Sequence, residues 1–244
     1  MIIRRILIGV LIALAVIFLG FQVFELEVEA SGMRALILVF LTILYCHTVR
    51  EKRLFFLSFL IVFTIADILA FMSWKIPLVT NNQIDLVYYI ANSLYIMAYS
   101  LLILQMLSAM NVVEIVKKYP FHILILIVLD VFCVVVVTNT AMHKLSYHEY
   151  YMEFVYNSII MILLTVSLIN YIHKEDKKGI NLLVGSIFIF FSEVIQLAYF
   201  YISSINLLNV MCSLFLVLAF FFFYLQSKLV YEPQENLMHR DLVV

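Results

Sequence analysis

Two acidic residues lie inside apolar runs of the sequence that carry no other charge. Asp67 lies in the middle of the run Phe59–Trp74, and Glu193 lies in a similar run near the other end of the chain. A carboxylate placed in hydrocarbon costs at least about 2–3 kcal/mol, so an intramembrane acid is by default a candidate functional residue. Two carboxyls that share a buried site favour one protonated and one ionised group, the pair that general acid and base catalysis needs. The same pair would also suit proton-coupled transport, and the chemistry of the acids alone leaves both alternatives open.

A stripe of hydrogen-bonding side chains accompanies these acids. Between residues 86 and 107, polar residues follow one another at steps of four, three and four, which is the spacing of one helix face: Tyr88, Asn92, Tyr95 and Tyr99. Gln196 shares a helix face with Glu193 in the same way. If the helices face one another, these side chains would line a site for a substrate. The stripe would equally suit packing and aromatic anchoring at a membrane interface, and Asn92 would suit a hydrogen bond between helices.

The composition indicates a membrane protein of several spans. The 244-residue chain is 66% hydrophobic and 13% charged, whereas soluble domains average about 45–50% and about 25%. Its mean hydropathy is +1.10. The three cysteines lie inside apolar runs, and no cluster of Cys and His suggests a disulfide framework or a metal site. We therefore expect no metal and no cofactor, and nothing in the sequence indicates a nucleic-acid partner.

Eight apolar segments are long enough to cross a membrane, because about 20 residues of helix span its hydrocarbon core. The runs are continuous rather than alternating, which favours helices over barrel strands. The sequence predicts an all-α, polytopic membrane protein in which residues 1–230 form a single eight-helix domain and residues 231–244 a short cytoplasmic tail. The predicted spans are Ile6–Phe24, Met33–Val49, Leu54–Trp74, Leu86–Leu107, Pro120–Val137, Tyr151–Ile172, Ile180–Tyr201 and Ile205–Gln226.

The distribution of basic residues predicts the orientation of these spans. Three basic residues, Arg34, Lys75 and Lys144, fall on one side, and the other twelve of the 15 fall on the opposite side. Because cytoplasmic loops carry the excess of Lys and Arg, both termini are expected in the cytoplasm. We expect an integral protein of a bacterial cytoplasmic (inner) membrane.

This orientation places the two acids at one depth. Asp67 and Glu193 lie on spans that run outward, and both are about 4 Å outward of the membrane midplane at a rise of about 1.5 Å per residue. We expect them to line one outward-facing cavity, with the Tyr and Asn stripe as its wall. Asp130, in the middle of the fifth span, has no strongly polar neighbour within a turn. A structural, hydrogen-bonded acid is expected there, and membership of the site is the alternative.

Three short motifs resemble those of the YhhN-type integral membrane family, whose members include lysoplasmalogenases. That family carries Ser-x-x-Gly-Asp in its third span, His-x-x-Tyr in its fourth and Ser-Asp in its seventh. The corresponding segments here are FTIAD at Phe63–Asp67, NSLY at Asn92–Tyr95 and FFSEV at Phe190–Val194. The chain departs from the pattern where Ala66 replaces Gly, Asn92 replaces His and Glu193 replaces Asp. Because the length and the number of spans also agree, the resemblance covers nearly the whole chain.

The resemblance implies hydrolysis of the vinyl ether bond of a lysoplasmalogen, which releases a fatty aldehyde and a glycerophospho-alcohol without a metal. It implies two catalytic residues, Asp67 and Glu193, one as the general acid and one as an ionised group that stabilises an oxocarbenium ion and deprotonates water. The partners would be a lysophospholipid and the membrane lipids. Catalytic geometry is sensitive to shifts of about 1 Å, so the departures at Asn92 and Glu193 also fit a divergent member with another lipid substrate or an inactive one. The implied substrate-binding residues are Asn92, Tyr95, Tyr99, Ser192 and Gln196.

A non-enzymatic function is the alternative on the same frame: a lipid-binding protein, a sensor or a small proton-coupled transporter. The third and seventh spans hold equivalent places in two four-helix halves and each carries an acid, as in the duplications that transporters use. The two halves share only scattered matches when they are aligned on these acids. Transporter spans are often broken, but the three prolines lie at span ends or beyond them. The sequence therefore favours an enzyme ancestry.

Overall fold

The computed structural model describes residues 2–49, 52–74 and 86–229. Within these ranges the chain forms nine helices and no strand, which confirms the all-α prediction. Eight of the helices are long and apolar enough to cross a membrane. The predicted tail at 231–244 lies outside the described residues. The helices are α1 (Ile2–Val23), α2 (Glu27–Thr48), α3 (Leu54–Ser73), α4 (Leu86–Leu107), α5 (Val112–Lys118), α6 (Pro120–Ala141), α7 (Tyr147–Lys174), α8 (Lys177–Tyr201) and α9 (Asn206–Lys228).

Several helices begin earlier than the apolar runs that predict them. α2 begins at Glu27 rather than Met33, and its first turn contains Glu27 and Glu29, where carboxylates favour the positive end of a helix. α7 begins after Ser146 rather than at Tyr151, because Ser146 and Glu149 form a capping box. The short helix α5 was not predicted. Hydropathy therefore locates the apolar centres of these spans, whereas polar and charged residues extend the starts of α2 and α7 beyond them.

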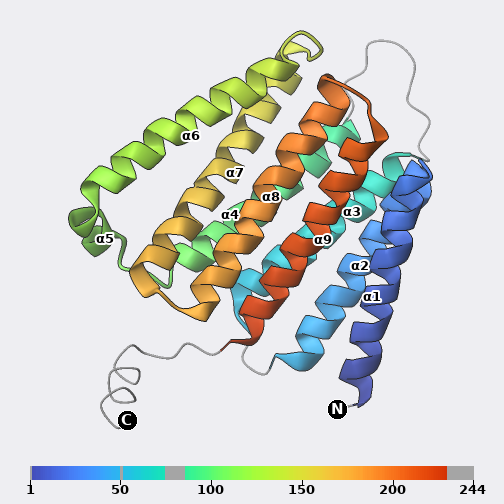
Figure 1. The fold of residues 1–244 in the computed structure, drawn as a ribbon, viewed down its shortest axis with the longest axis horizontal. Coiled ribbons are helices and arrows are strands. Elements are labelled where there is room, and N and C mark those ends of the chain that lie inside the picture. The colour runs from blue at the N-terminus through green and yellow to red at the C-terminus, as the bar shows by residue number, and fades with distance from the viewer. Residues whose placement is uncertain (1, 50–51, 75–85, 230–244) are drawn as a thin grey trace.

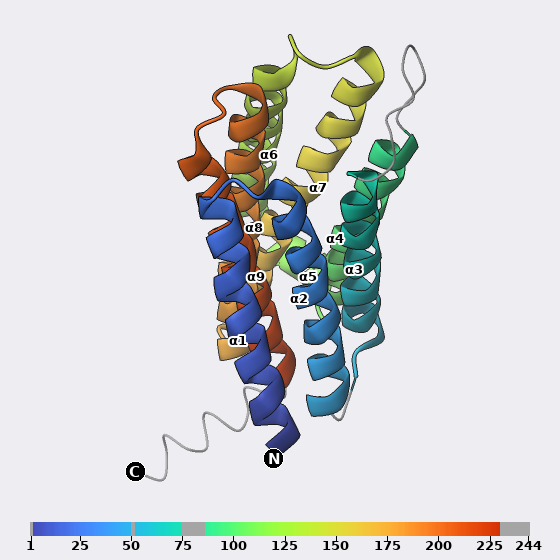
Figure 2. The same ribbon diagram turned by 90° about the vertical axis from the view of Figure 1, so that its right-hand side faces the viewer.

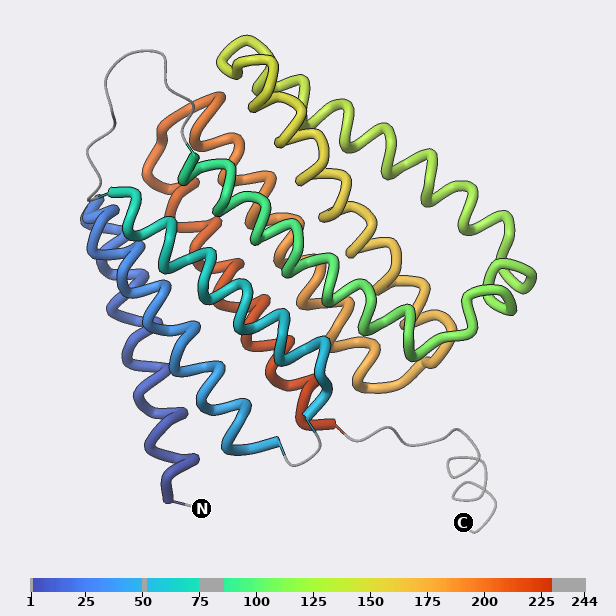
Figure 3. Tube along the Cα trace, turned by 180° about the vertical axis from the view of Figure 1, so that it is seen from behind, coloured from blue at the N-terminus to red at the C-terminus, as the bar shows by residue number. Residues whose placement is uncertain are grey.

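Seven of the helices form a closed ring in which each packs against the next: α1, α2, α3, α4, α7, α8 and α9, with α9 packing back against α1 (Figure 1, Figure 2). α6 lies outside the ring against α7 and α8, and α5 joins α4 to α6. The view from behind in Figure 3 shows α3 and α4 on the opposite side of the molecule from α8 and α9. The ring thus brings α3 and α8, far apart in sequence, to one interior.

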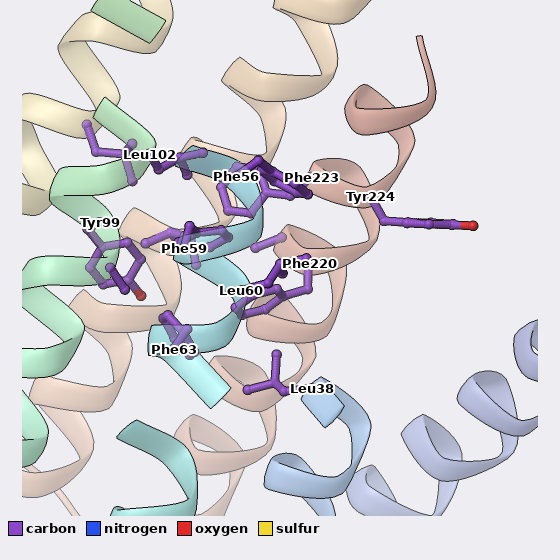
Figure 4. Close-up of a cluster of buried hydrophobic side chains, with 14 of the residues drawn as sticks. Leu38, Phe56, Phe59, Leu60, Phe63, Tyr99, Leu102, Phe220, Phe223 and Tyr224 are labelled. Atoms are coloured by element: carbon purple, nitrogen blue, oxygen red, sulfur yellow. The ribbon is translucent and has the colours of Figure 1, made fainter. Parts of the chain in front are cut away.

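Aromatic side chains fill part of this interior, on the side of Asp67 nearer the start of α3 (Figure 4). Phe59 stacks on Phe220 of α9 at a centroid distance of 5.8 Å, and Phe63 meets the same ring edge-on at 4.8 Å. Gly185 lets α8 approach α9 closely, because a Cβ at this position would lie 2.5 Å from the Phe223 ring. This packed core forms a rigid base for the polar residues that follow Phe63 along α3.

The two most peripheral helices are α1 and α6. In the apolar 18-residue stretch of each helix, only 6% of the residues of α1 and 11% of those of α6 are buried, against 39% in α3, α4 and α9. Their exposed side chains are large and apolar, as in Val16 of α1 and Phe132 of α6. Such surfaces suit contact with lipid tails rather than with water.

Basic residues gather at one end of the ring. The start of α1 and the end of α9 lie at this end (Figure 1). Described basic residues that flank the helix ends here are Arg4, Arg5, Lys52, Arg53, Lys117, Lys118, Lys174, Lys177, Lys178 and Lys228.

Candidate functional site

A polar cavity of about 220 Å³ lies inside the ring, between α2, α3, α4, α7, α8 and α9. Asp67 of α3 and Glu193 of α8 both line it. The structure therefore brings the two acids of the apolar runs to one cavity. Predicted site residues that also line the cavity are Asn92, Tyr95, Ser192 and Gln196.

Asp67 is held by hydrogen bonds on both of its carboxyl oxygens, and its side chain is only 1% exposed. Arg34 donates from Nε to Oδ2 at 2.9 Å, and the Tyr95 hydroxyl donates to Oδ1 at 2.5 Å. Arg34 also donates from Nη2 to the Tyr95 oxygen at 3.4 Å, which closes a triad across α2, α3 and α4. A carboxyl that accepts from a guanidinium and a phenol is in the environment of an ionised carboxylate.

Arg34 is a site residue that the sequence did not predict. The predicted span begins at Met33, which puts Arg34 at its edge and counts it with the basic residues of one membrane side. This is wrong, because α2 begins at Glu27 and Arg34 lies two turns inside it. The physical reason is the ion pair with Asp67, since mutual attraction and hydrogen bonds offset the cost of burying two charges. Hydropathy scores each segment alone and does not register a charge that is neutralised by another helix. The signal that could have found it is the helix-compatible stretch between Glu27 and Arg34, which contains no proline.

Glu193 has neutral hydrogen-bonding partners instead of a cation. The Tyr99 hydroxyl donates to its Oε1 at 2.9 Å, and the Tyr156 hydroxyl of α7 also interacts with it. Among the residues that the structure describes, Arg34 with Asp67 is the sole salt bridge. Because an unpaired carboxylate is costly to bury, Glu193 is the acid better suited to hold a proton.

The remaining predicted residues have distinct roles in the wall. Asn92 lines the cavity and donates from Nδ2 to the Tyr88 carbonyl oxygen at 2.9 Å. Ser192 donates its hydroxyl proton to the carbonyl of Cys212 at 2.8 Å, which ties α8 to α9. Tyr99 was expected in the wall, but it is fully buried and does not line the cavity. Tyr95 and Tyr99 therefore position the two acids, and Asn92 and Gln196 are the better placed to contact a ligand.

A third acid, Glu153 of α7, also lines the cavity, and the sequence analysis did not single it out. The Tyr88 hydroxyl donates to its Oε1 at 3.3 Å. Glu153 lies near the start of the predicted sixth span, where a charged residue is usually attributed to the membrane interface. The sequence could have indicated Glu153 by its depth in the membrane, because it lies near the start of the sixth span as Tyr88 lies near the start of the fourth.

Asp130 lies outside this cavity. It accepts a hydrogen bond from the Thr165 hydroxyl of α7 at 2.9 Å, which joins the peripheral helix α6 to the ring. Asp130 does not line the cavity that Asp67 and Glu193 share. The structure thus places it as an acid between helices, not as a third member of the site.

A second, apolar cavity of about 210 Å³ adjoins the polar one, and Arg34 and Leu216 line both. Its walls are aliphatic and aromatic side chains of α1, α2 and α9. On α1 the lining extends from Ile8 to Phe18, which at about 1.5 Å per residue is about 15 Å. This is the depth of one leaflet of a bilayer whose hydrocarbon core is about 30 Å thick.

In the part of the chain that the structure describes, no three His, Cys, Asp or Glu side chains are arranged so that they could hold a metal ion. The polar cavity therefore offers acid, base and hydrogen-bonding groups: one carboxylate paired with a guanidinium, and one carboxyl held by phenols. Comparison with protein-family models, with curated proteins and with solved structures gives no match to this chain.

Proposed function

We propose that this protein is a membrane-embedded hydrolase that cleaves the vinyl ether bond of a lysoplasmalogen. Glu193 is the general acid and Asp67 is its ionised partner. The observation that carries the proposal is the difference between two carboxyls of one cavity, since only Asp67 is paired with a cation. Acid and base roles are assigned in this way in other enzymes, where two titratable groups occupy contrasting environments.

The reaction needs only groups that line the cavity. Glu193 donates its proton to the outer alkene carbon, and the alkene electron pair forms the new C–H bond. The carbon attached to oxygen becomes an oxocarbenium ion, which the negative charge of Asp67 stabilises. Water adds to that carbon and loses a proton to a carboxylate, which gives a hemiacetal. The protonated carboxyl then gives its proton to the glycerol oxygen as the bond from carbon to that oxygen breaks, and the hemiacetal hydroxyl loses its proton to a carboxylate as the C=O bond forms. One water thus converts the vinyl ether into an aldehyde and an alcohol, and the cycle ends with one carboxyl protonated and one ionised, as it began.

The adjoining apolar cavity supports a lipid substrate with a single chain. A chain that extends from Arg34 along α1, α2 and α9 would keep its polar end beside Asp67 and Glu193. Arg34 uses two of its five N–H donors within the triad, and another would reach an oxygen of the lipid. Because α1 is the least buried helix of the ring, we propose that the lipid enters beside it.

We further propose membership of the YhhN-type family and insertion with the basic end of the ring in the cytoplasm of a bacterium. The second part is supported by the grouping of basic residues at the end where α1 starts and α9 ends. Labelling of a single cysteine introduced at Lys52 or at Lys144 in intact cells tests it. A reagent that does not cross the membrane should modify only the second.

The decisive experiment is lipid hydrolysis by the purified protein in detergent. A lysoplasmenyl lipid and the matched saturated lyso-ether lipid are supplied, and aldehyde release is followed. Aldehyde is expected from the vinyl ether alone, and Glu193→Gln should lower its rate by about 10²-fold or more, the usual contribution of a general acid. Asp67→Asn should also lower it.

The matched control is Asp130→Asn, which alters an intramembrane acid outside the cavity and should leave hydrolysis unchanged. Absence of aldehyde from folded wild-type protein would overturn the proposal. Lipid binding or proton-coupled transport, which the same two acids would also serve, would then be measured.

A further inference from the structure

A third cavity, of about 370 Å³, lies at the basic end of the ring, between the starts of α3 and α8 and the ends of α4, α7 and α9. Among the residues that the structure describes, none lines both this cavity and the polar cavity of Asp67 and Glu193. We propose that it binds the phosphate group of a phosphate monoester. This site is independent of the proposed hydrolysis.

Three cations from different elements line this cavity. Arg53 precedes α3, Lys174 ends α7 and Lys178 lies in the first turn of α8. They are close enough to interact electrostatically with one another. Asp176 is the one acid among the described residues of the wall, and its Oδ1 accepts from the backbone N–H of Gly179 as a helix cap. Cations from three elements suit the strong acceptor oxygens of a phosphate monoester, which carries a charge of about −2 near neutral pH.

Buried amides in the same wall provide an independent indication of a ligand. Gln226 is 1% exposed and Gln105 is 5% exposed, and both line the cavity. Among the described residues, neither carboxamide atom of Gln226 has a hydrogen-bond partner, and the Oε1 of Gln105 has none. Buried polar atoms are nearly always satisfied by protein, water or a ligand, because an unmade bond costs about 1–3 kcal/mol.

The donors and acceptors specify the ligand further. Arg53 offers a planar fork of N–H donors, and Lys178 uses one of its three donors on the Leu229 carbonyl at 3.2 Å. These groups and the Gln226 amide nitrogen suit the strong acceptor oxygens of a phosphate. The Gln105 oxygen accepts, so it suits a hydroxyl group on the same ligand. A phosphate ester of a polyol therefore fits the wall better than a simple carboxylate does.

The test uses the full-length protein in lipid-free detergent micelles. It is titrated with glycerol 3-phosphate and, separately, with inorganic phosphate, and calorimetry measures the heat of binding. Saturable binding of glycerol 3-phosphate is expected. Arg53→Gln and Lys178→Gln should each raise its Kd by about tenfold or more, since each removes a charged hydrogen bond. Lys178→Arg should retain binding. The matched control is Lys117→Gln, which removes a cation of α5 that does not line the cavity.

Gln226→Leu separates a binding site from a merely hydrated void. In a void, replacing an unpaired amide leaves the Kd unchanged, whereas in the proposed site it raises the Kd. In a parallel experiment on the protein in nanodiscs, binding of phosphatidate is compared with binding of phosphatidylcholine. Binding in micelles identifies a soluble ester, and binding in nanodiscs alone identifies a lipid headgroup. Lack of binding in both arms, or an equal loss in Lys117→Gln, would overturn the proposal.

Discussion

Asp67 and Glu193 occupy similar places on α3 and α8 and line one cavity, but they differ in their neighbours. Asp67 accepts from the guanidinium of Arg34 and the phenol of Tyr95. Glu193 accepts from the phenol of Tyr99, with Tyr156 as its second neighbour. One acid thus belongs to an ion pair, and the other belongs to a cluster of neutral hydroxyls.

The difference teaches that burial alone does not define the role of an intramembrane acid. An ion-paired carboxylate stabilises the fold only while its partner is present, and it fixes a negative charge at one wall of the cavity. A carboxyl among phenols can gain or lose a proton without leaving a cation behind. This contrast predicts different consequences for substitutions around each acid.

The largest expected effect is on the ion pair. Arg34→Met leaves the Asp67 charge buried without a partner, which should lower the free energy of unfolding by about 3–5 kcal/mol. Unfolding in mixed detergent micelles measures it. The double variant Arg34→Met with Asp67→Leu should recover much of this loss, because neither charge is then left unpaired. A double variant as unstable as Arg34→Met would show that the pair is not what holds Arg34 in the ring.

Removal of single hydroxyls should separate the two acids next. Tyr95→Phe deletes a bond to a charged carboxylate and should cost about 1.5–3 kcal/mol, whereas Tyr99→Phe deletes a bond to a neutral carboxyl and should cost about 0.5–1.5 kcal/mol. The same unfolding measurement on both variants gives the comparison. Equal losses would contradict the assignment of different charges to Asp67 and Glu193.

Glu193→Gln should have a smaller effect on stability. The glutamine keeps the shape of the side chain and the oxygen that accepts from Tyr99, so a change of no more than about 1 kcal/mol is expected. Asp67→Asn, which breaks the ion pair, is the matched comparison and should be clearly less stable than Glu193→Gln. The reverse order would assign the ionised role to Glu193.

The smallest effect is expected for Asp130→Asn. The amide oxygen can still accept from Thr165, and Asp130 is only partly buried on the peripheral helix α6. The free energy of unfolding should change by less than about 0.5 kcal/mol, the usual range for surface substitutions. A loss comparable to that of Arg34→Met would mean that Asp130 also carries a charge that the ring must compensate.

The sequence by itself determined the all-α architecture, the eight apolar helices and the helix face shared by Tyr88, Asn92 and Tyr95. These features depend on local periodicity and on the length needed to cross hydrocarbon, and both can be counted along the chain. It also indicated that Asp67 and Glu193 needed an explanation, because each is a charge-bearing group in an apolar run.

Only the tertiary structure decided how those acids are paired. The contact of Arg34 with Asp67 joins residues 33 positions apart, and that of Tyr99 with Glu193 joins residues 94 positions apart. Such pairings depend on which helices become neighbours when the ring closes from α4 to α7 and from α9 to α1. Because a buried charge is stable only with its partner, the position of Arg34 inside α2 could not be derived from the hydropathy of α2 alone.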